Sequence, residues 1–300
     1  MSLPKHALVL GGASGLLGRA VVAALREAGV FVIAASSAEV DYFDADDLTD
    51  YLDELDEDGP GPVDCIVNAV AYTQVDKAED EVEAAYRLNA SLPALLGVVA
   101  LERKLRLVHY STDFVFDGKK GAPYLPTDAP NPLSVYGASK LAGEEALLSL
   151  GLPGLLILRT AWLYGPGKMN FVRRMLDLAA ERPELRVVDD QHGSPTSTTD
   201  LGRMTVDLLR AGATGLLHAA NSGQTTWFGL ASEATRLAGL ACPVLPITTR
   251  EYPTRAVRPP YSVLDCTDLA RAIGSSPRPW QEALAEYVAG EVALARTAGA

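Results

Sequence analysis

Short apolar runs alternate with segments of helical spacing through the first half of the chain. The apolar runs predict strands that are buried on both faces, at 7–10, 31–34, 65–67, 105–110 and 155–158. Between them, apolar residues recur every three or four positions and predict helices over 16–28, 47–55, 79–89, 92–103 and 136–150. Because strand–helix–strand units cross over with a right hand, this alternation predicts an α/β fold with a doubly wound parallel sheet.

The pattern becomes irregular after residue 165. Helices are predicted at 171–181, 200–210 and 227–238, strands at 186–188 and 216–218, and a rigid proline-rich loop at 252–261. We interpret residues 1–165 as the larger unit. Residues 166–300 are then a smaller, interwoven part, some of whose segments return to the sheet.

Composition indicates a globular protein and excludes several classes of partner. Hydrophobic residues make up 48% of the 300 positions and charged residues 21%, and the formal net charge is −12. Nucleic acid or an anionic membrane would require a cationic face, so neither is expected as a partner. No uninterrupted apolar run approaches the roughly 18 residues of a membrane span, and residues 1–6 leave no room for a signal peptide, so a cytoplasmic location is expected.

The cysteines and histidines predict neither disulfides nor a metal. Cys65, Cys242 and Cys266 are an odd number without Cys-x-x-Cys spacing, and the four histidines have no metal-ligand spacing. Buried free thiols are the favoured interpretation, and no metal site is assigned.

A glycine pattern follows the first predicted strand directly. Gly12, Gly15 and Gly18 open the next helix, where Gly12 permits a tight turn, Gly15 lets the backbone approach a pyrophosphate and Gly18 lets helix and strand pack closely. The phosphates would rest on the helix N-terminus. Because the pattern lies between a strand and a helix, it favours dinucleotide binding over a structural turn.

The end of the second predicted strand bears on the choice of nicotinamide cofactor. An acidic residue there binds the ribose 2′-hydroxyl and repels a 2′-phosphate, whereas this chain has Ala35, Ser36 and Ser37. The serines and Arg19 could contact a 2′-phosphate, which favours NADPH and leaves NADH open. Arg19 is equally well explained as a solvated helix residue.

Tyr136 and Lys140 are four positions apart on a predicted helix and therefore share one face. A phenol has a pKa of about 10, and a nearby ammonium would lower it towards the range of proton exchange at neutral pH. Thr112 ends the preceding predicted strand, at the sheet edge where ligands bind in doubly wound folds, and its hydroxyl could donate to a substrate carbonyl. These three residues are the predicted catalytic group.

Several longer segments resemble the extended short-chain dehydrogenase/reductase family, and within it the dTDP-4-dehydrorhamnose reductase group. The resemblance covers nearly the whole chain, and its segments are 67–79, 109–118, 136–144, 159–165, 190–196, 225–227 and 258–259. The glycine and Tyr/Lys motifs mark only the superfamily. The Val-Asp-Lys-Ala-Glu run at 75–79 and Arg-Thr-x-Trp at 159–162 are specific to the reductase group.

The resemblance implies a Rossmann fold and NAD(P)H-dependent reduction of the C4 ketone of a dTDP-4-keto-6-deoxyhexose, in the first place dTDP-4-dehydrorhamnose to dTDP-rhamnose. Tyr136 would donate the proton, Lys140 would bind the nicotinamide ribose, and Thr112 would orient the carbonyl. Further cofactor contacts would be Gly15, Leu16 and Leu17 at the pyrophosphate, Asp41 and Tyr42 at the adenine, and Ala71, Tyr72 and Thr73 at the nicotinamide. The sugar would be faced by Thr73, Val75, Asp113 and Trp162.

Two further residues, Trp227 and Arg258, can each be interpreted in two ways. Trp227 and Arg258 are expected as nucleotide and phosphate contacts, or else as a core tryptophan and a surface arginine. One residue departs from the resemblance: Ala35 stands where the related reductase has an aspartate, so the cofactor preference does not carry over. A homodimer is left open.

Alternatives differ in what they require. Dehydratases of the family need an acid after Thr112 and Asp113, where this chain has Phe114, and epimerases need an acid at Ala35. The rival from another class is an NADP-binding regulatory subunit like the methionine adenosyltransferase β subunit, which the run 15–21 resembles. Another sugar-nucleotide short-chain reductase is the remaining alternative.

Overall fold

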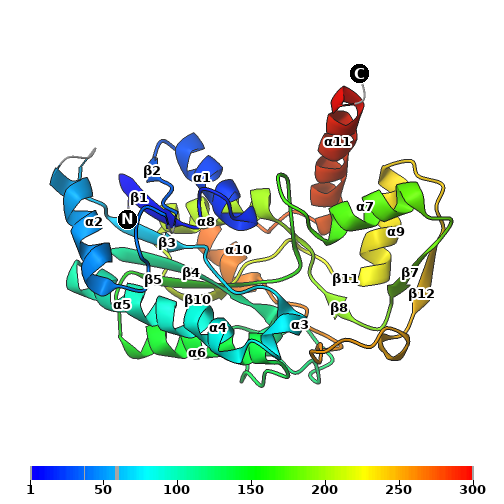
Figure 1. The fold of residues 1–300 in the computed structure, drawn as a ribbon, viewed down its shortest axis with the longest axis horizontal. Helices are drawn as coiled ribbons and strands as arrows, with labels where there is room; N and C mark the ends of the chain where they lie inside the picture. Colours follow the sequence, from blue (N-terminus) through cyan, green and yellow to red (C-terminus); the bar gives the residue numbers. More distant parts are fainter. Residues whose placement is uncertain (1, 37, 58–60, 299–300) are drawn as a thin grey trace.

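A six-stranded parallel sheet forms the centre of the larger part of the molecule (Figure 1). The computed structural model describes residues 2–36, 38–57 and 61–298. The strand order is β10-β5-β4-β3-β1-β2, and every neighbouring pair is parallel. The strands are β1 (His6–Leu10), β2 (Phe31–Ile33), β3 (Cys65–Asn68), β4 (Arg106–Thr112), β5 (Leu155–Thr160) and β10 (Gly215–His218). The predicted doubly wound parallel sheet is confirmed.

Helices cover both faces of this sheet, because successive side chains of each strand point to opposite faces. One face packs on α1 (Leu16–Glu27), α8 (Thr198–Ala211) and α10 (Thr267–Ile273). The other packs on α2 (Ala45–Glu57), α5 (Leu92–Glu102) and α6 (Val135–Ser149). In β1, Ala7 and Val9 belong to the first core, and Leu8 and Leu10 belong to the second.

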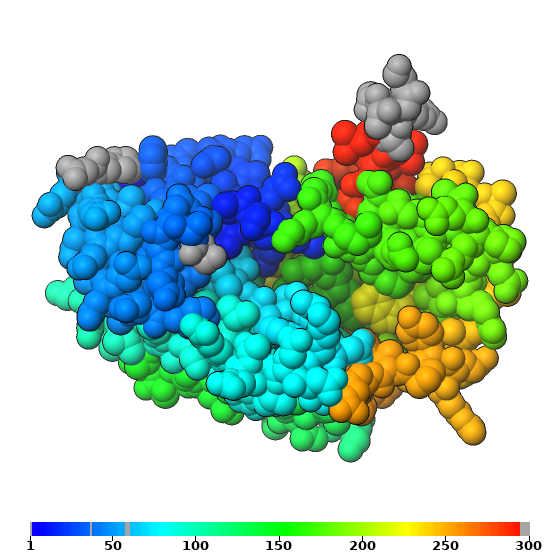
Figure 2. All heavy atoms as spheres, viewed as in Figure 1, coloured from blue at the N-terminus to red at the C-terminus, as the bar shows by residue number. Residues whose placement is uncertain are grey.

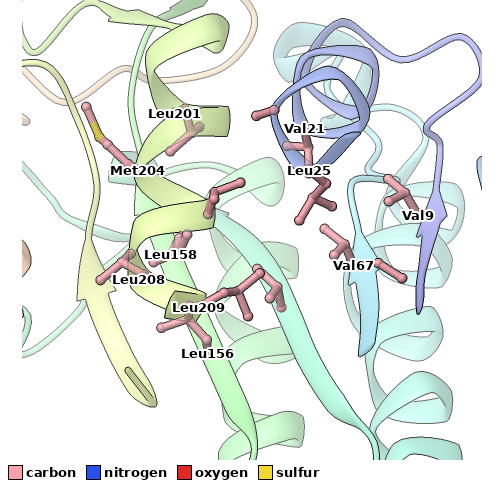
Figure 3. Close-up of a cluster of buried hydrophobic side chains, with 14 of the residues drawn as sticks. Val9, Val21, Leu25, Val67, Leu156, Leu158, Leu201, Met204, Leu208 and Leu209 are labelled. Atoms are coloured by element: carbon pink, nitrogen blue, oxygen red, sulfur yellow. The ribbon is translucent and has the colours of Figure 1, made fainter. Parts of the chain in front are cut away.

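The first of these cores joins residues from distant parts of the chain. Figure 3 shows Val21 and Leu25 of α1 and Leu201 and Leu208 of α8 lying over the sheet, where Val67 is also fully buried. Helix α8 belongs to the second half of the sequence, and β10 follows it at the edge of the sheet beside β5. Three elements beyond residue 165, α8, β10 and α10, thus complete the first unit.

The rest of the second half forms a smaller part beside the sheet (Figure 1). Its core joins α7 (Phe171–Glu181), α9 (Trp227–Leu237) and α11 (Trp280–Ala298). Its short strand pairs are β7 (Leu185–Val188) with β12 (Val244–Ile247), β8 (His192–Gly193) with β11 (Thr225–Thr226), and β6 (Leu163–Tyr164) with β9 (Thr196–Ser197). The division at residue 165 stays a prediction.

The segment after β3 differs from the single helix predicted at 79–89. It contains α3 (Val75–Ala78), α4 (Val82–Tyr86) and a π-helical turn, η1 (Arg87–Ser91), that runs into α5. The Asn89 side chain accepts a hydrogen bond from Tyr72 N at 2.9 Å and donates to Ser139 Oγ at 3.0 Å. These long-range bonds, which periodicity cannot reveal, accompany the widened turn. Helices α10 and α11 were not predicted from the sequence either.

One stretch, Val82–Glu102, is long and apolar enough by composition to cross a membrane, which the sequence analysis did not anticipate. In the structure 44% of the most apolar 18-residue part of this stretch is buried, and the stretch is divided among α4, η1 and α5. Core helices of globular proteins pass the same test, so this stretch is weak evidence for a membrane span.

The glycine loop after β1 is packed so closely that its glycines are sterically required. A Cβ on Gly18 would lie 2.2 Å from Gly11 O, and a Cβ on Gly15 would lie 2.7 Å from the same atom. Real Cβ atoms are not found that close to a backbone oxygen. The start of α1 therefore touches the turn that leaves β1.

Gly18→Ala is expected to destabilise the protein by about 1–3 kcal/mol, because the added methyl must displace backbone rather than a side chain. Gly290→Ala in α11 is the matched control: a Cβ there meets nothing within 4 Å, and alanine favours a helix over glycine by about 0.5–1 kcal/mol. Urea unfolding of both variants measures the difference. A Gly18→Ala protein as stable as the wild type would contradict the close packing.

Candidate active site

A large cleft of about 1500 Å³ lies between the sheet and the smaller part, and Figure 2 shows the hollow where the blue-to-cyan half meets the green and orange half. It opens at the carboxyl ends of the strands, where the strand order reverses between β1 and β3. Most of the predicted site residues line it: Gly15, Leu16, Leu17, Ala71, Thr73, Val75, Thr112, Asp113, Tyr136, Lys140, Trp162, Trp227 and Arg258.

The glycine loop after β1, which is predicted to hold the pyrophosphate, presents backbone amides to the cleft. Gly15 is the N-cap of α1 and has extended backbone (φ −70°, ψ 147°), and no side chain caps the helix there. Leu16 and Leu17 follow it along the cleft wall. The backbone amides of the first helical turn and the positive end of the helix dipole suit an anionic pyrophosphate, so the residues present fit a dinucleotide.

The end of β2 carries an acid that its sequence position did not reveal. Glu39 Oε2 accepts hydrogen bonds from Ser36 N and Ser36 Oγ, each at 2.7 Å. These bonds hold the pKa of Glu39 below its ordinary value, so it is charged at neutral pH. The sequence has no acid at 35–37, but a local turn brings the Glu39 carboxylate back to Ser36 three residues later. Ser37 lies outside the described residues.

The predicted adenine contacts, Asp41 and Tyr42, are not among the residues that line the cleft. Tyr42 is buried, and its burial together with the nearby Glu39 raises the pKa of its phenol to about 12. Asp41 Oδ1 accepts a hydrogen bond from Phe43 N at 2.9 Å. Gly12, Ser36, Asp41, Tyr42 and Tyr72 are the predicted site residues that the structure does not place in the cleft lining. Their roles stay predictions.

Tyr72 points away from the cleft. Its hydroxyl donates to Glu81 Oε2 at 2.5 Å, and its backbone N and O are both bound by the Asn89 side chain. Only its neighbours Ala71 and Thr73 reach the cleft surface. The side chain and the backbone of Tyr72 thus both have partners within the protein, and its cofactor contact stays a prediction.

Thr112 and Asp113 end β4 and begin a short 3-10 turn, η2 (Asp113–Val115). Thr112 Oγ1 accepts a hydrogen bond from Phe114 N at 3.2 Å and donates one to Asp113 Oδ1 at 3.1 Å. Asp113 Oδ2 also accepts a hydrogen bond from Ser262 Oγ at 2.5 Å. Burial raises the pKa of Asp113 to about 6, although these hydrogen bonds oppose the rise. The strand end thus presents one neutral hydroxyl and one carboxyl group that ionises with difficulty.

Tyr136 lies in the first turn of α6, which Ser134 caps by accepting a hydrogen bond from Gly137 N at 3.1 Å. The Tyr136 ring contacts the Phe114 ring edge to face, with the ring centroids 5.6 Å apart. Burial raises its pKa to about 12, and the hydrogen bond with Thr112 opposes that rise. Tyr136 and Thr112 are thus neighbours, as the predicted catalytic group requires.

Lys140 is almost fully buried and bound to β4. Its Nζ donates to Tyr110 O at 2.6 Å and lies 3.3 Å from His109 Nε2. Burial lowers the pKa of Lys140 to about 8, while the Glu144 carboxylate opposes the shift. The expected lowering of the Tyr136 pKa by this ammonium is not found, because Lys140 faces the strand and burial dominates at the phenol.

A buried ion pair holds α6 against the sheet. Glu144 accepts from Arg159 Nε at 2.9 Å and from Arg159 Nη2 at 2.6 Å, and Ser111 Oγ donates to the same carboxylate. Arg159 also lies over the Phe116 ring, 5.1 Å from its centroid. No role was predicted for Glu144 and Arg159, although both lie in segments that resemble the reductase group.

Two stacked tryptophans form the opposite wall of the cleft. Trp162 and Trp227 have ring centroids 3.6 Å apart and lie nearly parallel, at 6°. Trp162 has a left-handed backbone (φ 48°), which is rare for a bulky residue and is found at functional sites. Trp227 Nε1 also donates to Gln191 Oε1 at 3.2 Å. Both rings line the cleft, so Trp227 is not a core residue only.

Arg258 forms an ion pair with Asp76, which lies in the 75–79 run that is specific to the reductase group. Its Nη2 lies 2.6 Å from Asp76 Oδ2 and its Nη1 lies 3.0 Å from Asp76 Oδ1. This guanidinium holds the pKa of Asp76 below its usual value. Arg258 is partly buried and lines the cleft, so it is not the surface arginine of the second reading, and its phosphate contact stays a prediction. Among the described residues, no group of three or more His, Cys, Asp or Glu side chains could hold a metal.

A doubly wound sheet with a tyrosine, a lysine and a strand-end hydroxyl around one cleft defines a nicotinamide-dependent reductase of the short-chain type. Comparison with known proteins gives the family. Residues 6–292 match the family described as RmlD substrate binding domain, and the chain belongs to that family.

Related proteins from several bacteria are similar over almost their whole length. The dTDP-4-keto-6-deoxy-D-glucose reductase of Streptomyces niveus is 40% identical over 92% of this chain and 94% of its own. The dTDP-4-dehydrorhamnose reductase of Streptomyces griseus is 39% identical over 94% and 93%. The crystal structure of dTDP-4-dehydrorhamnose reductase from Bacillus anthracis in complex with NADP has a TM-score of 0.87 and 32% identity, covering 96% of this chain and 99% of that one.

Glu39→Gln is expected to raise the ratio of kcat/KM with NADPH to kcat/KM with NADH by about fivefold, because it removes a negative charge beside the end of β2. Glutamine keeps an oxygen that can accept the Ser36 hydrogen bonds. Glu102→Gln is the matched control, since Glu102 is exposed and ends α5 just before the amino end of β4. Equal ratios in the wild type and Glu39→Gln would show that Glu39 does not meet the ribose.

Proposed function

We propose that this protein uses NADPH to reduce the C4 ketone of a dTDP-4-keto-6-deoxyhexose, and that dTDP-4-dehydrorhamnose, which would yield dTDP-rhamnose, is its main substrate. The observation that carries the proposal is the pairing of Tyr136 with Thr112 at the carboxyl end of β4, inside the cleft. A carbonyl placed there would meet a proton donor and a hydrogen-bonding hydroxyl together.

The relatives support this substrate class. Two similar proteins carry the names of reductases acting on dTDP-4-keto-6-deoxy sugars, and a third, from Streptomyces antibioticus, is named as a probable dTDP-linked 4-ketoreductase. The B. anthracis structure in complex with NADP supports NADPH as the cofactor, and NADH remains the alternative. A cytoplasmic location is part of the proposal, supported by relatives named as biosynthetic reductases.

In the proposed reaction NADPH supplies a hydride to C4 of the sugar. Tyr136 donates its hydroxyl proton to O4 as the carbonyl oxygen gains charge. The Thr112 hydroxyl, whose hydrogen points at Asp113 Oδ1 in this structure, would turn to donate a hydrogen bond that orients the same oxygen. The high pKa of Tyr136 keeps the phenol protonated before the reaction. Lys140 would serve the ribose, which requires its Nζ to leave part of its contact with β4.

The sugar and nucleotide would lie across the cleft from these groups. Thr73, Val75, Asp113 and Trp162 would face the sugar, and Trp227 and Arg258 would contact the nucleotide and its phosphates; all six residues line the cleft. Phe114 occupies the position where a dehydratase needs an acid, and its ring packs on Tyr136 instead. This supports reduction without prior elimination of water.

Tyr136→Phe is expected to lose about 10²–10⁴-fold in kcat, the usual contribution of a general acid, while NADPH binding and folding survive. Thr112→Val is the milder comparison, because one neutral hydrogen bond contributes about 0.5–1.5 kcal/mol. Steady-state assays with dTDP-4-keto-6-deoxyhexoses, followed at the nicotinamide absorbance, measure both. A Tyr136→Phe enzyme that turns over at the wild-type rate would place the proton donor elsewhere.

A further inference from the structure

A chain of hydrogen bonds runs from the switch point of the sheet to Lys140. Asn68 ends β3, and His109 is its register partner on β4, so both side chains lie on the face that α6 covers. Asn68 Nδ2 lies 3.1 Å from His109 Nδ1, and His109 Nε2 lies 3.3 Å from Lys140 Nζ. His109 is fully buried, and Asn68 and Lys140 are each about 1% exposed.

The direction of donation along this chain follows from its first member. Val70 N donates to Asn68 Oδ1 at 3.0 Å, which fixes the oxygen of the amide and turns its NH₂ group towards His109. An NH₂ group donates, so His109 Nδ1 must accept. A neutral imidazole with an accepting Nδ1 carries its hydrogen on Nε2, and that hydrogen points at Lys140.

The direction of the His109 Nε2 hydrogen determines which protonation state of Lys140 is favoured. A protonated lysine has three donors and no acceptor, so an ammonium would oppose the Nε2 hydrogen, whereas a neutral amine accepts it with its lone pair. His109 itself stays neutral, because burial and the neighbouring Lys140 lower its pKa well below the ordinary value. The geometry therefore favours the amine over the ammonium independently of the cost of burying a charge.

Several other groups lie around Lys140 and bear on its protonation state. On α6, Glu144 lies one turn further and favours the ammonium, but it is bound by Arg159 of β5 and by Ser111 of β4. Tyr136 lies one turn earlier on the same helix. On β4 the Tyr110 carbonyl accepts from Lys140 in either protonation state. Burial is the largest influence and lowers the lysine pKa to about 8.

We propose that His109 is a positioning residue that donates its Nε2 hydrogen to Lys140 and so keeps this lysine exchanging its proton near neutral pH. The inference rests on the proposed function, in which the ammonium of Lys140 serves the cofactor ribose. His109 is fully buried and is not part of the cleft lining, so it would act only by stabilising the neutral form of Lys140. Asn68 sets the tautomer of His109 that makes this donation.

The test is the affinity for NADPH as a function of pH, measured by nicotinamide fluorescence between about pH 6 and 10 without sugar substrate. Wild-type affinity should fall as Lys140 loses its proton, with a midpoint near pH 8. His109→Leu removes the donated hydrogen bond, so its midpoint should rise by about one pH unit. His109→Gln keeps an N–H that can reach Lys140, so its midpoint should stay nearer the wild type.

Lys140→Met tests whether the pH dependence comes from Lys140, because the NADPH affinity of this variant should no longer change over this pH range. Circular dichroism of each variant shows that the fold survives. A His109→Leu midpoint equal to that of the wild type would overturn the inference, and so would a wild-type curve retained in Lys140→Met. Failure of the wild type to bind NADPH at any pH would instead overturn the proposed function, and the inference with it.

Discussion

The buried pair of Glu144 and Arg159 is the constraint on which the geometry of the site depends. Glu144 lies one helical turn from Lys140 and two from Tyr136, and Arg159 comes from the neighbouring strand β5. Both side chains are at most 4% exposed, so neither charge can turn to water. Removing one partner of such a pair typically costs about 3–5 kcal/mol, because the other charge stays buried. The pair thus fixes how far along β4 the helix α6 lies.

Because α6 is fixed in this way, its first turn meets the end of β4. Tyr136 reaches Thr112, and Lys140 reaches Tyr110 O and His109. The smaller part supplies the opposite wall, where the strained backbone of Trp162 allows its ring to stack on Trp227. Strain of this kind persists only where packing imposes it, and Gly193 leaves the space: a Cβ there would lie 2.3 Å from the Trp162 ring.

Local pattern predicts most of the first unit, because strand alternation, the glycine loop and the i, i+4 pair are all short-range signals. It fails where a contact joins distant residues. The Asn89 bonds to Tyr72 and Ser139 replace a regular helix by η1, and no periodicity shows them. The partner of Lys140 lies 31 residues away on β4, so spacing alone placed the ammonium beside Tyr136 rather than His109. Glu39 was missed for the opposite reason, since a tight turn returns it to Ser36.

The central claim is that this cleft moves a hydride from NADPH to C4 of a dTDP-linked 4-keto sugar. The most direct measurement uses NADPH that carries deuterium on one or the other face of nicotinamide C4, together with dTDP-4-keto-6-deoxyhexose and the wild-type protein. Proton NMR of the product then reports what is bound to sugar C4. The account predicts deuterium at that carbon from one labelled face and protium from the other. A product with protium at C4 from both labelled cofactors, or no consumption of NADPH, would contradict it.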